Sequence, residues 1–256
     1  MPPPARAALL LLLLLACAAS SASARGLRSY GCALHDKLRE FARNRRFHDS
    51  PDDFHRGGAS GREFFQLNWE PSIRCIADKR VGAAGDGGKW VCDPDCLLAA
   101  SNCTVFSVGS NNEWGFENAM EPYGCRIHTF DHTVAAPAPP PHVTFHPYGA
   151  AAQSAGNLKS LPDMYALTGV TGRIDVLKID CEGYEYAVLR DAATLAFLRR
   201  HVKQLLVEIH FTSAAATEAL AQALTDAGFR TFSKEPNIQY SDGSCIEYAL
   251  LNIHAI

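Results

Sequence analysis

The chain has 256 residues, of which 47% are hydrophobic and 20% are charged, so it can bury the core of one sizeable α/β domain but not of two. Its formal net charge is −3 and its isoelectric point is near 6.4. These values argue against general nucleic-acid binding, which needs a basic face, and we expect a globular domain without nucleic-acid partners.

The first 24 residues are typical of a secretory signal peptide. Arg6 precedes an apolar run that contains the leucines Leu9 to Leu15, and the segment ends in Ala22-Ser23-Ala24 before Arg25. The run is shorter than the roughly 20 residues of a spanning helix, so cleavage is favoured over a signal anchor, which is the alternative. The sequence predicts a protein of the secretory pathway, lumenal or extracellular, that makes no membrane contact after cleavage.

The cysteine content fits an oxidising compartment in which disulfides form. Removal of Cys17 with the signal peptide leaves eight of the nine cysteines. Those near the first expected core strand are Cys75, Cys92, Cys96, Cys103 and Cys125. One or two bridges are expected to tie the N-terminal segment to the sheet, with the pairing open. A zinc site that starts at Cys92-x3-Cys96 is the alternative, although no second pair follows it.

Residues 25–61 are expected to form an accessory segment, and residues 62–256 the α/β domain. Apolar residues at three- and four-residue spacing predict an amphipathic helix between residues 27 and 47, and glycine and aspartate predict a flexible linker after it. Aromatic residues around the turn Gly85-Asp-Gly-Gly88 predict a small β or irregular cap between residues 62 and 94.

Strands and helices alternate from residue 104 onward, which predicts a doubly wound sheet. The first core strand, Thr104 to Ser110, runs into a glycine-punctuated turn and a helix, as in nucleotide-cradling loops. The turn is not a G-x-G-x-x-G motif, so a plain connection is the alternative. A second strand, Arg126 to Asp131, ends in an acid, which in Rossmann-like sheets hydrogen-bonds a ribose.

The central strand, Ile174 to Ile179, is an apolar run that ends in Asp180 and Glu182. Ligands bind at the carboxyl ends of strands in open α/β sheets, so these carboxylates stand where chemistry is expected. The structural alternative is that Glu182 and Glu185 lie in the first turn of the following helix, where negative charge is favoured, and that Lys178 pairs with a neighbouring acid.

The following helix is expected to span Tyr184 to Arg200. A further buried strand, Gln204 to Phe211, carries Glu208 and His210 on one face. The last strands, near residues 229–232 and 245–253, are expected as an antiparallel pair at the edge of an otherwise mostly parallel sheet.

Five segments resemble the methyltransferase-like protein 24 type domain, a relative of the FkbM-type methyltransferases. They are Val105 to Glu117, Ile127 to Asp131, Phe145 to Gly149, Val176 to Gly183 and Leu206 to His210. The resemblance implies a Rossmann-like class I fold and an S-adenosylmethionine-dependent methyltransferase. By analogy, the acceptor is an oxygen on a glycan, a lipid or a small metabolite.

The resemblance also implies cofactor-binding residues. Gly109 and Asn111, with Trp114 nearby, border the methionine part of the cofactor, Asp131 holds the ribose, and Gly149 lies near the adenine. The full expected set is Ser107, Gly109, Asn111, Trp114, Asp131, Gly149 and Ala150. Ser107 departs from the usual pattern, because many relatives have an acid there.

The catalytic hypothesis places Asp180, Glu182, Glu208 and His210 around the acceptor, with His210 or an acid taking its proton. No metal is required, because the methyl group leaves a sulfonium by direct displacement and the site supplies alignment and a base. A divalent metal held by Asp180, Glu182 and His210 is the alternative.

Two other functional classes stay open. The domain could be a non-catalytic secreted module that keeps the Rossmann-like fold for binding. It could also be a nucleotide-sugar or dinucleotide enzyme, against which the absent G-x-G-x-x-G motif argues.

Overall fold

The computed structural model describes residues 60–75, 77–98, 103–237, 239 and 243–254. The expected signal peptide and the amphipathic helix between residues 27 and 47 lie outside these ranges and stay predictions, as do the proposed domain boundaries. None of the helices within the described ranges has both the length and the apolar character that crossing a bilayer requires.

Seven strands form the central sheet. They are β3 (Thr104–Val108), β4 (Arg126–Phe130), β5 (Val143–His146), β8 (Ile174–Ile179), β9 (Val202–His210), β10 (Phe229–Pro236) and β11 (Cys245–Asn252). Their order across the sheet is β10-β11-β9-β8-β3-β4-β5. Among the described strands of this sheet, the two pairs that include β11 are antiparallel and the other four are parallel. The predicted mostly parallel sheet with an antiparallel C-terminal strand is therefore confirmed.

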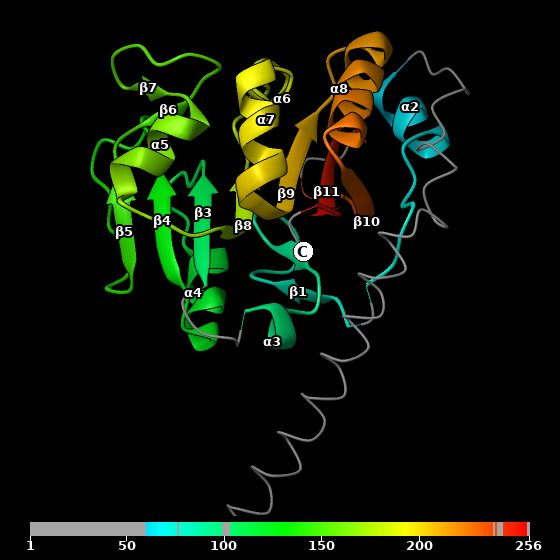
Figure 1. Ribbon diagram of the computed structural model, residues 1–256. Coiled ribbons are helices and arrows are strands. Elements are labelled where there is room, and N and C mark those ends of the chain that lie inside the picture. The colour runs from blue at the N-terminus through cyan, green and yellow to red at the C-terminus, as the bar shows by residue number, and fades with distance from the viewer. Residues whose placement is uncertain (1–59, 76, 99–102, 238, 240–242, 255–256) are drawn as a thin grey trace, which may run out of the picture.

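Helices cover one face of this sheet (Figure 1). They are α2 (Gly61–Leu67), α5 (Leu161–Thr168), α6 (Glu185–Leu189), α7 (Ala192–His201) and α8 (Ala214–Asp226). β8 sends Leu177 and Ile179 into this layer and Val176 to the opposite face, and all three are fully buried. A strand that is apolar on both faces is what its sequence predicted.

A cap covers the opposite face. It consists of the hairpin β1 (Lys79–Val81) and β2 (Lys89–Val91) and of the helices α3 (Pro94–Leu97) and α4 (Gly115–Met120). The buried amide of Gln204 on β9 fastens the cap, because its Oε1 accepts from the Cys92 N–H at 2.8 Å and its Nε2 donates to the Cys92 carbonyl at 3.0 Å. A short helix η1 (Glu121–Tyr123) and a small sheet of β6 (Gly149–Ala150) and β7 (Leu158–Lys159) complete the described elements.

The single helix expected from Tyr184 to Arg200 is instead two helices, α6 and α7. Asp191 causes the break, since it adopts an extended backbone and its carboxylate accepts a hydrogen bond from the Thr194 N–H at 2.8 Å. This is the geometry of a helix N-cap, which begins a new helix rather than continuing the old one.

Two disulfides join residues that the sequence had grouped. Cys75 pairs with Cys92 inside the cap, and Cys103 pairs with Cys125 just before β3 and β4. Cys96 is disulfide-bonded as well, so the alternative zinc site at Cys92 and Cys96 is wrong. The second bridge ties the N-terminal ends of two neighbouring strands, opposite the edge at which ligands bind.

A pair of stacked histidines makes the stability of the sheet edge depend on pH. His128 Nδ1 lies 3.0 Å from His146 Nε2, and burial, with the charges of His146 and Arg126, lowers the pKa of His128 to about 4. The unfolded chain takes up this proton near pH 6.5 but the folded chain only near pH 4, so stability falls as the pH drops between these values.

We expect acidification from pH 7 to pH 4.5 to cost about 1–3 kcal/mol of unfolding free energy through this pair. Urea denaturation at the two pH values measures the loss. The loss of unfolding free energy should be smaller in His128→Gln. It should stay unchanged when the exposed His132 is replaced by glutamine. An equal loss in both variants would contradict a role for the pair.

Candidate functional site

Gly109 and Asp131, expected at the cofactor, and Asp180, expected at the acceptor, lie at one edge of the sheet. The Gly109 N–H donates to the carbonyl of Phe130 at 2.9 Å, and the Asp180 N–H donates to the carbonyl of Val108 at 2.9 Å. The carboxylate of Asp131 accepts from the backbone of the loop after β3. The carboxyl ends of β3, β4 and β8 therefore bring Gly109, Asp131 and Asp180 together.

Gly109 permits this close approach. Its φ is +83°, and a Cβ at this position would lie 1.7 Å from the carbonyl oxygen of Asp180. Only glycine fits such a backbone without strain. Lys178, which the sequence hypothesis paired with an acid, donates to the Gly109 carbonyl at 2.7 Å, so the β8 side chain also holds the turn after β3.

Asp131 organises that turn. Its Oδ2 accepts from the N–H groups of Ser110 and Asn111 at 2.8 and 2.9 Å, and its Oδ1 accepts from the Thr133 N–H and hydroxyl at 2.8 and 2.6 Å. Burial raises the pKa of Asp131, but these hydrogen bonds outweigh it and lower the pKa to about 2. The acid is thus an ionised anchor of the loop as well as the residue expected to meet a ribose.

The other expected cofactor residues border the same loop. Ser107 is fully buried on β3, and Trp114 donates from Nε1 to the Asn112 side chain at 3.2 Å. Gly149 and Ala150 form β6, and a Cβ on Gly149 would lie 2.2 Å from Nδ1 of His132, the neighbour of Asp131. The structure therefore places Ser107 on β3, Trp114 at the start of α4 and Gly149 beside the loop after β4, with Ala150 next to Gly149 in β6.

The expected catalytic residues differ in accessibility. The side chain of Asp180 is 15% exposed and that of Glu182 is 86% exposed, whereas Glu208 is only 3% exposed. Burial raises the pKa of Asp180, but the charges of Lys178 and Lys89 outweigh it and lower the pKa. Asp180 is consequently an ionised carboxylate that a bound molecule can reach.

His210 lies between carboxylates, with Nε2 3.3 Å from Glu182 and Nδ1 3.5 Å from Glu185. Burial lowers its pKa, but Glu185 and the charges of Glu208 and Glu182 outweigh this effect and raise the pKa to about 9. Its imidazole is protonated at neutral pH, a state that donates hydrogen bonds but cannot accept a proton.

Glu185 is a site residue that the sequence hypothesis assigned only to the first turn of a helix. It is fully buried, and its two carboxylate oxygens accept from the Cys181 and Gly183 N–H groups at 2.7 and 2.9 Å. This arrangement holds the turn between Asp180 and α6, in which Glu182 takes a left-handed φ of 51°.

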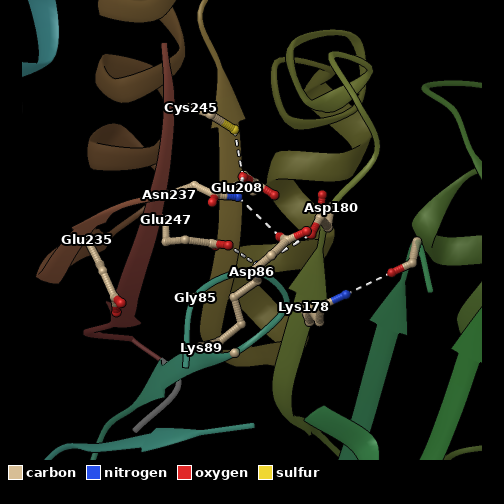
Figure 2. Close-up of polar contacts among 12 residues, drawn as sticks. Gly85, Asp86, Lys89, Lys178, Asp180, Glu208, Glu235, Asn237, Cys245 and Glu247 are labelled. Carbon is tan, nitrogen blue, oxygen red and sulfur yellow. Dashed lines mark hydrogen bonds and ion pairs between the residues drawn. The ribbon is translucent and has the colours of Figure 1, made fainter. Parts of the chain in front are cut away.

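The sequence hypothesis also missed the contribution of the cap. Lys89 on β2 is 1% exposed, and its ammonium donates to Glu247 on β11 and lies 3.4 Å from Asp180. Glu247 lies opposite Glu208 in the β9–β11 register, and Figure 2 shows both acids with Asp180 and Asp86. No local pattern marks Lys89, which follows a glycine-rich turn and lies 158 positions before Glu247.

Solved structures resemble the fold only distantly. The Methanococcus jannaschii fibrillarin pre-rRNA processing protein is 11% identical, with 70% of this chain and 84% of that chain covered and a TM-score of 0.42. A putative ribosomal RNA methyltransferase from Plasmodium falciparum is 16% identical, with coverage of 61% and 88% and a TM-score of 0.38.

A third structure is the Burkholderia thailandensis 1,6-didemethyltoxoflavin-N1-methyltransferase with bound 1,6-didemethyltoxoflavin and S-adenosylhomocysteine. It is 14% identical, with coverage of 59% and 71% and a TM-score of 0.37. TM-scores this low carry no argument about function. A search of curated proteins found no match.

Family membership comes from the sequence itself. A family model described as a methyltransferase domain matches residues 32–252, which is most of the chain. The matched range includes the loop after β3, the acid after β4 and the carboxylates after β8. The protein therefore belongs to this methyltransferase domain family and is an S-adenosylmethionine-dependent methyltransferase.

Proposed function

We propose that this methyltransferase acts on an oxygen of a glycan, a lipid or a small metabolite in the secretory pathway. The observation that carries the proposal is the convergence of Gly109, Asp131 and Asp180 at one edge of the sheet. The disulfides Cys75–Cys92 and Cys103–Cys125 support an oxidising compartment. The family match supports turnover over the alternative of a non-catalytic binding module.

The residues at the ends of β3 and β4 fit an adenosyl ligand. Gly109 has no side chain that would cover the backbone of the turn. Asp131 fixes the N–H groups of the two residues that follow Gly109, Ser110 and Asn111. The buried Ser107 hydroxyl has no hydrogen-bond partner within the described ranges, so it can still take one. The residues that would hold the cofactor are Ser107, Gly109, Asn111, Trp114, Asp131, Gly149 and Ala150.

S-adenosylmethionine supplies an electrophilic methyl group on a sulfonium when it is bound. The chain then has to align an acceptor hydroxyl and take its proton. Asp180 is the proposed proton acceptor because its carboxylate is ionised and partly exposed. Glu208 and His210 lie behind it and orient the acceptor end of the site, and exposed Glu182 lies at its rim.

Asp131→Asn tests the cofactor part of the proposal. We expect about 10-fold weaker binding of S-adenosylmethionine in calorimetry, because an amide cannot accept all the backbone donors that now order the loop. Asp191→Asn is the control, since Asp191 also accepts from a backbone N–H but lies at the start of α7. Equal affinities in the two variants would count against the assigned loop.

The acceptor class is tested separately with the full chain and labelled S-adenosylmethionine. Glycans, lipids and small metabolites that carry hydroxyl, amine or thiol groups are offered in parallel, and transfer of the label to an oxygen of one class is the expected result. Asp180→Asn should abolish that transfer while it leaves cofactor binding intact. Label transfer only to nitrogen or sulfur acceptors would refute the proposed oxygen chemistry.

A further inference from the structure

Four carboxylates from separate parts of the chain meet under the cap. Asp86 comes from the β1–β2 loop, Asp180 follows β8, Glu208 lies on β9 and Glu247 on β11. One carboxylate oxygen from each residue lies within 4.8 Å of the others. Figure 2 shows the four groups turned toward one another, so the carboxylate cluster is a compact arrangement of oxygen atoms.

Lys89 alone does not neutralise this carboxylate cluster. Its ammonium donates to Glu247 Oε1 and lies 3.4 Å from Asp180 Oδ2, and the charge of Lys178 also acts on Asp180. Lys89 is thus the one cation that contacts the cluster among the hydrogen bonds and ion pairs of the described residues, and it reaches two of the four acids. Glu208 and Glu247 are 3% and 5% exposed, so water does not screen them well. Buried charges are costly unless they are paired or bind a metal ion.

A second observation points to a missing partner. Glu247 Oε2 is buried and has no hydrogen-bond partner within the described ranges, although Oε1 of the same side chain contacts Lys89. A buried acceptor without a hydrogen-bond partner costs free energy and is rare in native proteins. A bound ligand at this oxygen would explain it.

Other side chains hold the carboxylates in place. The Asn237 amide donates to Asp86 Oδ1 at 3.1 Å and to Glu208 Oε1 at 2.8 Å. The cap loop is thereby fixed to the sheet with Asp86 facing the acids of β9 and β11. The donor set consists of carboxylate oxygens, which hard divalent cations such as Ca²⁺, Mg²⁺ and Mn²⁺ prefer.

We propose that Asp86, Asp180, Glu208 and Glu247 bind a divalent cation with a preference for oxygen ligands. The cation would bind Glu247 Oε2, favour the ionised form of the four acids and join the cap loop to the carboxyl ends of β8 and β9. This site differs from the Asp180, Glu182 and His210 group considered from the sequence, because it draws on the cap and on β11 and not on the exposed Glu182. The proposal concerns cation binding and not methyl transfer, and cation binding at this site does not require turnover.

Calorimetric titration of the EDTA-treated full chain with CaCl₂, MgCl₂ or MnCl₂ tests the proposal. We expect one saturable site for at least one of these cations and a higher melting temperature in its presence. Asp86→Asn keeps the shape and the Asn237 contact but loses a charged ligand, so it should weaken binding about 10-fold or more. Asp95→Asn, an exposed acid of the same cap that pairs with Lys79, should bind like the parent chain.

Glu247→Gln is the second variant, and circular dichroism reports whether each variant is folded. Loss of binding in folded Asp86→Asn and Glu247→Gln chains supports the site. Absence of binding to the parent chain, or equal affinity in Asp86→Asn and Asp95→Asn, would overturn it. No cofactor or acceptor is present in these titrations, so their result is independent of the outcome of the methyl-transfer assay.

Discussion

Replacing Lys89 with methionine is expected to lower the free energy of unfolding by about 3–5 kcal/mol in metal-free buffer. Lys89 is 1% exposed and contacts Glu247 and Asp180. Burial lowers its pKa, but the charges of Glu247, Asp180 and Glu208 outweigh this and hold the pKa above its usual range. The residue is therefore a buried cation, and its removal takes away the counter-charge that contacts Glu247 and Asp180.

Chemical denaturation measures this loss, and Lys79→Met is the matched control. Lys79 lies in the same hairpin, but it and its partner Asp95 are 48% and 45% exposed, so its loss should cost less than about 1 kcal/mol. The double variant Lys89→Met with Glu247→Leu should recover part of the stability, because it removes a buried charge with its partner. Similar losses in the two single lysine variants would show that the buried contacts contribute no more than the exposed pair.

The second large effect is expected from Gly109→Ala, which should destabilise the fold by more than about 3 kcal/mol and abolish cofactor binding. The new Cβ would lie 1.7 Å from the Asp180 carbonyl oxygen, and neither backbone can retreat easily. Gly109 is hydrogen-bonded to Phe130, and the Asp180 N–H is bonded to Val108. The methyl group must therefore force apart the ends of β3 and β8.

Gly124→Ala separates this clash from backbone strain. Gly124 also has a positive φ, of +70°, but a Cβ there would meet nothing within 4 Å. We expect a loss of about 1 kcal/mol at Gly124, from the left-handed backbone alone, and unchanged binding of S-adenosylmethionine. Thermal denaturation and calorimetry compare the two variants. If Gly109→Ala lost no more stability than Gly124→Ala and still bound S-adenosylmethionine, the turn after β3 would accommodate the methyl group without a clash.

The sheet could be predicted because its strands carry strong local signals. The run from Ile174 to Ile179 is apolar on both faces, and parallel strands order their carboxyl ends at one edge, so Gly109, Asp131 and Asp180 could be placed together from the sequence. The break between α6 and α7 was less visible, because Asp191 acts as a helix cap only once its backbone leaves the helical conformation.

The part of the site under the cap could not be predicted. Lys89 and Asp180 are 91 positions apart, and Asn237 and Asp86 are 151 positions apart. Contacts at such separations depend on how the cap docks on the sheet, which no periodicity in the chain encodes. Lys178 shows the same limit on a smaller scale, because its ammonium donates to the Gly109 carbonyl as well as acting on the neighbouring acid Asp180, and its charge suggested only the acid.

The position of β11 has a consequence for biosynthesis. It is the last strand that the structure describes, yet it lies inside the sheet between β9 and β10. While the ribosome is still adding residues 245–252, the growing chain exposes an open hydrogen-bonding edge on β9, and such edges template aggregation. A chain that lacks β11 therefore keeps this open edge, and a premature stop codon before Cys245 would yield a product that is prone to aggregate.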